Sequence, residues 1–189
     1  MIKDLYDGIE LYHGSYCEVR TPDINMCARY KDFGRGFYLT TEIEQARQFA
    51  MLSARKAKAN GIVDTDQKYG VVSSFKYRVD QSVMTRIYPE ADASWLHCIV
   101  GHRKTGTFDN IVSELEKYDI IGGKIANDAT NATILTYMAG TLGEVGSSRA
   151  DQICISLLLP ERLKDQFCFR TEKGLRQLEF IESEQVWMR

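Results

Sequence analysis

One segment combines a glycine-rich turn, a short strand and the start of a helix: Phe33-Gly34-Arg35-Gly36-Phe37-Tyr38-Leu39-Thr40-Thr41-Glu42-Ile43-Glu44. Residues 36–40 contain aromatic and β-branched side chains and predict a strand. Thr41 and Glu44 have the spacing of a capping box, with Thr41 as the N-cap. We therefore expect a helix over residues 42–59, whose apolar face is made of Ile43, Ala46, Phe49, Ala50 and Ser53.

Strands and helices are mixed irregularly on both sides of this segment. Polar residues 16–35, with Pro22, predict a long loop. Apolar patterns predict strands over residues 9–13, 70–79, 118–123, 166–170 and 179–182. Helices are predicted over residues 91–102, 109–117, 128–138, 149–159 and 172–178. Because the order lacks a regular βαβ alternation, we expect an α+β fold rather than a doubly wound sheet.

Length and composition indicate one folded domain over residues 1–189. The 24 Lys and Arg against 26 Asp and Glu give a net charge of -2. This balance excludes binding of nucleic acid through a strongly basic surface. No apolar stretch is long enough to span a membrane, and the N-terminus lacks the apolar region of a signal peptide. We therefore expect a cytoplasmic protein without a membrane partner.

The cysteines and histidines argue against disulfides and a metal site. Five cysteines without a C-x-x-C pair fit reduced, buried thiols. Two of the three histidines, His97 and His102, are five residues apart, which does not place them on one helix face. No metal ligand set is predicted.

Three motifs follow one another along the chain in a recognisable order. His13-Gly14-Ser15 comes first, the segment from Phe33 to Thr40 comes second, and Asp165-Gln166-Phe167 comes late in the chain. This order resembles the His-Tyr-Glu branch of the ADP-ribosyltransferase superfamily, which includes poly(ADP-ribose) polymerases and diphtheria-like toxins. In that comparison, Phe49 stands eleven positions after the motif tyrosine, where the family has an aromatic residue that stacks on nicotinamide.

The chain also resembles a small bacterial family of that superfamily, often encoded beside a small partner gene in a toxin–antitoxin arrangement. The resemblance rests on Tyr12–Ser15, Pro22–Ile24, Asp32–Thr40, Gln45–Ala46, Tyr118–Asp128 and Leu163–Leu178. It implies two packed, mostly antiparallel sheets flanked by helices, NAD as co-substrate and no metal. It also implies a macromolecular acceptor, a small antitoxin partner, and a role as a toxin or defence effector.

The resemblance implies catalytic roles for His13, Tyr38 and Gln166. It implies that NAD is contacted by His13, Gly14, Ser15, Gly36, Tyr38 and Phe49. A glycine lets the main chain approach a ligand closely, and the resemblance implies that Gly14 approaches the nicotinamide carboxamide in this way. It also implies that His13 contacts a hydroxyl of the adenosine ribose. Two aromatic rings, those of Tyr38 and Phe49, are suited to clamp nicotinamide, a contact worth about 1 to 3 kcal/mol per ring by analogy with base stacking.

Gln166 stands where the family has glutamate. A glutamine keeps the hydrogen bond to the nicotinamide ribose but lacks the negative charge near the cationic transition state. We therefore expect mono-ADP-ribosylation of a protein or nucleic acid, without chain elongation. Two alternatives stay open: a non-catalytic module that binds NAD or ADP-ribose, and an NAD glycohydrolase.

Structural explanations exist for the same residues. Tyr38 and Phe49 are also suited to fill a core, and Gln166 to lie exposed on a strand. The cations Arg47, Arg55, Lys56 and Lys58 are suited to a solvated helix face, or to a track for the NAD diphosphate or a nucleic-acid acceptor.

Overall fold

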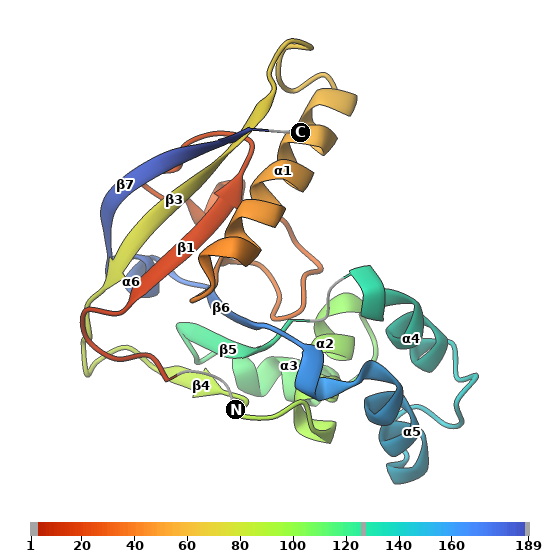
Figure 1. The fold of residues 1–189 in the computed structure, drawn as a ribbon. Coiled ribbons are helices and arrows are strands. Elements are labelled where there is room, and N and C mark those ends of the chain that lie inside the picture. The colour runs from red at the N-terminus through yellow and green to blue at the C-terminus, as the bar shows by residue number, and fades with distance from the viewer. Residues whose placement is uncertain (1–3, 126–127, 188–189) are drawn as a thin grey trace.

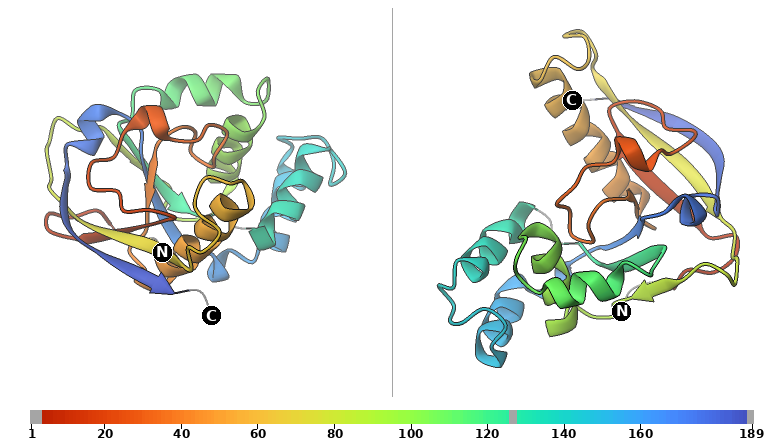
Figure 2. Two further views of the ribbon diagram at one scale, coloured as in Figure 1. Left: turned by 90° about the horizontal axis from the view of Figure 1, so that it is seen from above. Right: turned by 180° about the vertical axis from the view of Figure 1, so that it is seen from behind.

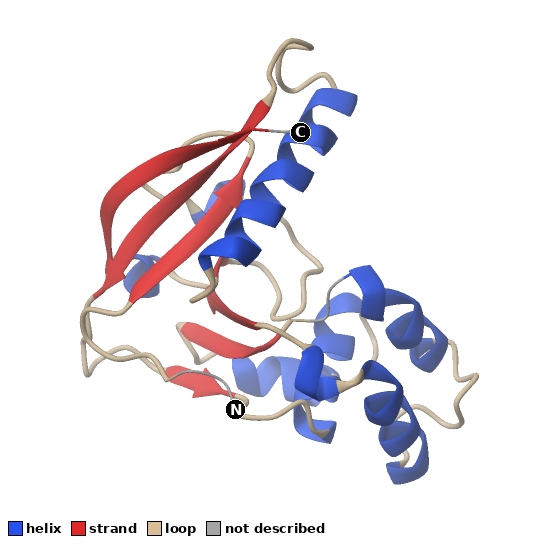
Figure 3. Ribbon diagram, viewed as in Figure 1, coloured by secondary structure: helices blue, strands red, loops and turns tan. Residues whose placement is uncertain are grey.

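The computed structural model describes residues 4–125 and 128–187, which form seven strands and six α-helices around two sheets (Figures 1 and 3). The three-stranded sheet contains β1 (Glu10–Ser15), β3 (Tyr69–Tyr77) and β7 (Leu178–Trp187), in that order. The four-stranded sheet has the order β2 (Phe37–Leu39), β6 (Asp165–Phe169), β5 (Ile120–Lys124) and β4 (Thr85–Ile87). The helices are α1 (Ile43–Ala59), α2 (Ala93–Arg103), α3 (Asp109–Leu115), α4 (Asp128–Met138), α5 (Ser148–Leu158) and α6 (Glu172–Leu175). The α+β class is confirmed.

Within the described residues, β4 pairs with β5 in parallel, and every other strand pairing in the two sheets is antiparallel. The sheets meet at their edges, where β1 and the end of β2 form a two-residue bridge. There the Tyr12 amide donates to the Thr40 carbonyl at 2.8 Å, and the Thr40 amide donates to the Tyr12 carbonyl at 3.0 Å. This bridge holds the first predicted motif beside the second.

One apolar cluster is shared by the two sheets. Leu11 of β1, Phe75 of β3, Phe37 of β2 and Phe167 of β6 all bury their side chains in it. Side chains alternate across a strand, so Tyr38 and Cys168 point to the opposite side of the four-stranded sheet, toward a second cluster. The four-stranded sheet therefore has an apolar layer on each face.

The second cluster lies among α2, α3, α4 and α5, which form a group distinct from α1 (Figure 2). Trp95 and Ile99 of α2, Cys154 of α5 and Phe33 of the long loop are buried there. Among the described residues, no helix is both long and apolar enough to span a membrane.

Helix α1 lies against β1 and β3 at very short range (Figure 1). A side chain at Gly14 would lie 2.7 Å from the main-chain nitrogen of Ala50, and one at Gly70 would lie 2.9 Å from the Ala50 Cβ. The buried face of α1 consists of Gln45, Ala46, Ala50, Ala54 and Ala57. The predicted stripe is therefore wrong in part: the close approach admits alanine, whereas Phe49 stays 38% exposed.

The predicted capping box of α1 is also wrong. The N-cap is Glu42, which makes no side-chain capping bond, and its amide donates to the Thr40 hydroxyl at 3.1 Å. Glu44 instead pairs with Arg47. The Thr40 hydroxyl thus accepts from the amide of the N-cap residue, the donor that a capping box pairs with the side chain at the third helical position.

Other boundaries differ modestly from the predictions. The short strand β4 was not predicted, because three partly exposed residues carry little pattern. Strand β7 continues to Trp187, well beyond the predicted end at residue 182. All five cysteines are free, and burial is confirmed for Cys98, Cys154 and Cys168, but Cys17 is exposed and Cys27 is partly exposed.

Candidate functional site

His13 is held by a hydrogen bond between β1 and β2. Its Nδ1 lies 2.8 Å from the carbonyl oxygen of Tyr38, and its ring packs on Phe37 with centroids 4.2 Å apart. Burial lowers the pKa of His13 below the usual 6.5, although the bond to Tyr38 acts in the opposite direction. A neutral ring that donates from Nδ1 presents Nε2 as an acceptor, which suits a ligand hydroxyl.

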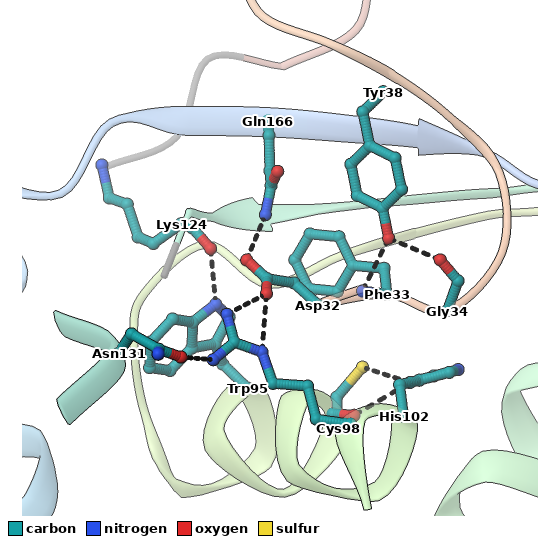
Figure 4. A network of polar contacts seen from close by, with 11 residues as sticks. Asp32, Phe33, Gly34, Tyr38, Trp95, Cys98, His102, Lys124, Asn131 and Gln166 are labelled. Atoms are coloured by element: carbon teal, nitrogen blue, oxygen red, sulfur yellow. Dashed lines mark hydrogen bonds and ion pairs between the residues drawn. The ribbon is translucent and has the colours of Figure 1, made fainter. Parts of the chain in front are cut away.

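Tyr38 uses its side chain to fix the loop that precedes its own strand. The hydroxyl donates to the Gly34 carbonyl at 2.7 Å and accepts from the Phe33 amide at 2.9 Å (Figure 4). Burial raises the pKa of Tyr38 well above its usual value, so the hydroxyl keeps its proton. The ring packs against the helical cluster.

The two glycines of the second motif are required by close approaches. Gly34 has a φ of 80°, and a side chain there would lie 2.6 Å from the His102 ring. A side chain at Gly36 would lie 2.7 Å from the Phe169 carbonyl of β6. These glycines let the loop turn sharply and run close to α2 and β6.

Gln166 contacts Asp32, which in turn pairs with Arg103, and the sequence interpretation selected neither of these charged residues. Its Nε2 donates to Oδ2 of Asp32 at 2.8 Å, and Oδ1 of Asp32 accepts from Nε of Arg103 at 3.0 Å (Figure 4). Nη2 of Arg103 donates to the same Oδ1, and Nη1 donates to Asn131 at 3.0 Å. Gln166 is buried, so the suggestion that it lies exposed on a strand is wrong.

A second polar pair lies next to Gln166 on β6. Nζ of Lys124 lies 2.7 Å from Oδ1 of Asp165, and the Lys124 carbonyl accepts from the indole of Trp95 at 2.9 Å. Gln45 of α1 donates to the Asp165 carbonyl at 3.4 Å, while its own Oε1 is buried without a partner among the described residues. Polar groups from α1, α2, β5 and β6 therefore converge here.

Hydrogen bonds connect the three predicted motifs through the loop at residues 32–34. His13 bonds the Tyr38 main chain. The Tyr38 hydroxyl bonds Phe33 and Gly34, and the preceding residue Asp32 bonds Gln166 (Figure 4). The side chains do not share one pocket, since His13 packs toward Phe37 and the core between the sheets, whereas Tyr38 and Gln166 face the helical layer.

The remaining predicted contacts have separate locations. Gly14 lies under α1 and Ser15 is buried. Phe49 is on α1, and none of the ring contacts within residues 4–125 and 128–187 pairs it with Tyr38 or His13. A nicotinamide clamp formed by Tyr38 and Phe49 stays a prediction. Of the segment 118–128, residues 126 and 127 lie outside the described residues.

The basic face of α1 is weaker than its sequence indicates. Arg47 donates from Nε to Glu184 of β7 at 2.7 Å and also pairs with Glu44 of its own helix. Two carboxylates therefore offset this cation, and the track predicted for a diphosphate is reduced to Arg55, Lys56 and Lys58.

An open pocket of about 280 Å³ is lined by Asp32 and Arg103. It is also lined by Tyr30, Lys31, Asn131, Leu135 and Met138. In the part of the chain that the structure describes, no group of three or more His, Cys, Asp or Glu side chains is arranged to hold a metal. The site can thus offer hydrogen bonds, a buried carboxylate and an aromatic surface.

Asp32 and Arg103 are the functional candidates that sequence reasoning missed. Asp32 precedes the second motif directly, so its position was a signal, but a single acidic residue in a polar loop carries no role by itself. Arg103 ends α2, far from each motif in the sequence, and only the tertiary fold brings it to Asp32.

Comparison with known proteins gives one match. The family model described as "Protein of unknown function (DUF3990)" matches residues 9–180, from the start of the β1 region into β7. No curated protein and no solved structure matches the chain. The matched range contains all three motifs, together with Asp32 and Arg103, and the chain belongs to the DUF3990 family.

Proposed function

We propose that this protein is an NAD-dependent mono-ADP-ribosyltransferase that modifies an intracellular macromolecule and acts in the cytoplasm. The observation that carries the proposal is the series of hydrogen bonds from His13 through Tyr38 and residues 32–34 to Gln166. Three motifs that resemble those of one enzyme superfamily, far apart in the sequence, are thus connected by direct contacts.

The proposal places the two ends of NAD at His13 and Gln166, whose side chains do not share one pocket. A dinucleotide has two riboses joined by a diphosphate, and the resemblance assigns His13 to the adenosine ribose and Gln166 to the nicotinamide ribose. A neutral His13 that donates from Nδ1 has an acceptor left for a ribose hydroxyl. The buried Oε1 of Gln45, without a partner among the described residues, is a further acceptor next to Asp165.

The proposed reaction breaks the bond between C1′ of the ribose and the pyridinium nitrogen. The bonding electron pair goes to that nitrogen, nicotinamide leaves as a neutral molecule, and C1′ becomes oxocarbenium-like. A lone pair of the acceptor then forms the new bond to C1′, and the acceptor loses a proton to water. Gln166 contributes hydrogen bonding rather than a formal charge, which agrees with transfer of a single ADP-ribose unit.

Labelled NAD tests the proposal directly. Purified protein incubated with NAD labelled in the adenylate and with a bacterial lysate should label a protein or nucleic acid, and His13→Ala should abolish the labelling. His97→Gln is the matched control, because His97 pairs with Asp151 in the helical layer, and it should leave the labelling unchanged. Equal labelling by wild type and His13→Ala would contradict the catalytic assignment.

The same samples separate the two alternatives. NAD binding in calorimetry without nicotinamide release identifies a binding module, an alternative favoured by the absence of glutamate at position 166. Free ADP-ribose that accumulates without any acceptor identifies an NAD glycohydrolase. Absence of NAD binding rejects all three functions.

The toxin role has its own test. Expression of the wild-type chain in bacteria should arrest growth, and His13→Ala should relieve the arrest. A small antitoxin encoded beside the gene should restore growth when it is co-expressed with the wild-type chain. Normal growth with the active enzyme would contradict the effector role and leave the enzymatic proposal intact.

A further inference from the structure

We propose that Asp32 is a positioning residue that turns the Gln166 amide so that its carbonyl oxygen, rather than its NH2 group, faces the nicotinamide ribose of NAD. This inference rests on the proposed function and identifies how a glutamine serves in a position that the related enzymes fill with glutamate. It concerns a contact between the loop before β2 and strand β6.

The orientation of the amide follows from the chemistry of its partner. A carboxylate only accepts hydrogen bonds, so the group of Gln166 that faces Oδ2 of Asp32 at 2.8 Å must be the donor Nε2. The oxygen of a planar amide points away from its nitrogen. Oε1 is therefore turned away from Asp32 (Figure 4).

Asp32 is itself held in place. Nε of Arg103 donates to its Oδ1 at 3.0 Å, Nη2 of Arg103 donates to the same atom, and Nη1 is fixed by Asn131 at 3.0 Å. A guanidinium that donates from several nitrogens fixes the orientation of the carboxylate as well as supplying a positive charge beside it. Oδ1 is thereby directed to Arg103, and Oδ2 is the oxygen that meets Gln166.

Burial makes this arrangement selective. Asp32 and Gln166 are each only 6% exposed, so water does not compete well for either group. An amide turned the other way would bring two acceptor oxygens together in a buried site, which is unfavourable. One of the two amide orientations is therefore strongly preferred.

The outcome resembles what a glutamate would provide. Oε1 of Gln166 can accept a hydrogen bond from a ribose hydroxyl, as a carboxylate oxygen does. The carboxylate of Asp32 polarises the amide through Nε2 and increases the negative character of Oε1 where positive charge develops on the ribose.

Asp32→Asn should reverse the group that Gln166 presents. Because Arg103 donates toward position 32, the carbonyl oxygen of the introduced amide will face Arg103 and its NH2 will face Gln166. Gln166 must then turn its oxygen toward that NH2 and direct its own NH2 toward the ribose. We expect kcat for nicotinamide release to fall about 10- to 100-fold, with the KM for NAD changed less than about threefold.

Exchanging the acid and the amide between positions 32 and 166 should restore a hydrogen-bond acceptor for the ribose. Gln166→Glu alone brings two carboxylates together, and the side chain at position 166 should swing away, so kcat should fall. In the double variant Asp32→Asn/Gln166→Glu, the NH2 introduced at position 32 donates to one carboxylate oxygen while the other faces the ribose. We expect kcat of the double variant to exceed that of either single variant by at least about tenfold.

The comparison of the two single variants with the double variant needs controls for activity and for folding. Glu114→Gln removes an exposed carboxylate on α3 and should leave kcat unchanged. Each variant is assayed well below its own unfolding temperature. If Asp32→Asn does not fold, the comparison of the double variant with Gln166→Glu decides alone.

A wild-type protein that releases no nicotinamide overturns the proposed function. With an active wild type, unchanged kcat in Asp32→Asn overturns the positioning role, as does a double variant no faster than Gln166→Glu alone.

Discussion

His13 shows how a single side chain is set by its surroundings. Its Nδ1 is bound to the Tyr38 carbonyl, its ring packs on Phe37, and burial lowers its pKa. His102 is similar: burial lowers its pKa, and its Nδ1 lies 2.8 Å from the Cys98 carbonyl. Both rings are therefore neutral in the folded protein near neutral pH.

These two histidines predict a loss of stability in acid. Since their folded pKa values lie below the unfolded value of 6.5, the unfolded state binds more protons as the pH falls through that range. Their stabilising contribution is complete above the unfolded pKa and is lost as the pH falls toward the folded pKa. Urea unfolding of wild type should show a fall in stability from about pH 7 to about pH 5.

Substituting each histidine tests whether these two residues cause the loss of stability in acid. His13→Gln and His102→Gln should each show a shallower dependence of unfolding free energy on pH than wild type. Parallel curves for wild type and both variants would show that these rings do not titrate as described.

Packing against α1 requires a glycine at position 14, independently of any contact with NAD. A Cβ there would collide with the main chain of α1 at Ala46 and Ala50, which cannot move aside as a side chain can. We expect Gly14→Ala to lower the free energy of unfolding by about 2 to 3 kcal/mol. Gly8→Ala is the control, because Gly8 has a φ of 83° and open space, so only its backbone conformation is penalised, by about 1 kcal/mol. Equal losses would show that α1 adapts.

At the scale of elements, the loop before β2 is fixed by the strand that follows it. The Tyr38 hydroxyl bonds Phe33 and Gly34, and Asp32 bonds Gln166 of β6 and Arg103 of α2. The loop thereby joins three elements that the sequence separates widely. The proposed orientation of the Gln166 amide requires this loop to be held in place, because the loop carries Asp32.

Tyr38→Phe should loosen this loop. It leaves the Phe33 amide and the Gly34 carbonyl without their partner, which we expect to cost about 1 to 3 kcal/mol of stability. Hydrogen exchange of the Phe33 amide should accelerate, and nicotinamide release should slow. Tyr12→Phe removes an exposed hydroxyl bound to Glu10 and should change the stability by less than about 0.5 kcal/mol. Unchanged exchange at Phe33 would contradict the anchoring role.

At the scale of the molecule, the cluster shared by the two sheets predicts cooperative unfolding. Side chains of β1, β2, β3 and β6 are buried together, so neither sheet keeps its core without the other. The chain has two tryptophans in different regions: Trp95 is buried in the helical layer and Trp187 lies at the end of β7. Urea unfolding of Trp95→Phe and Trp187→Phe, each followed by the remaining indole and by circular dichroism, should give coincident transitions within each variant. A separate transition for the helical layer would show two domains.

Most helices and strands could be predicted because their apolar residues recur at regular spacing in the sequence. The helix at residues 128–138 and the strands containing His13, Tyr38 and Gln166 were expected at nearly their observed positions. The failures have local causes. The start of α1 depends on which hydroxyl accepts from the N-cap amide, and the buried face of α1 depends on how closely Gly14 and Gly70 allow the helix to approach.

The candidate site was only partly predictable. Motif order selected His13, Tyr38 and Gln166, but the partners Asp32 and Arg103 depend on how the loop packs between β6 and α2. An ion pair formed by two residues 71 positions apart leaves no periodic signal in the sequence.

A structure of the protein with bound NAD tests the central claim most directly. It would be solved for the slow Asp32→Asn variant with NAD, and for wild type with an NAD analogue that resists cleavage. We predict that the adenosine ribose contacts Nε2 of His13, that nicotinamide lies near Tyr38 and Phe49, and that in wild type Oε1 of Gln166 accepts a hydrogen bond from the nicotinamide ribose. NAD bound away from these residues, or no bound NAD at saturating concentration, would contradict the account.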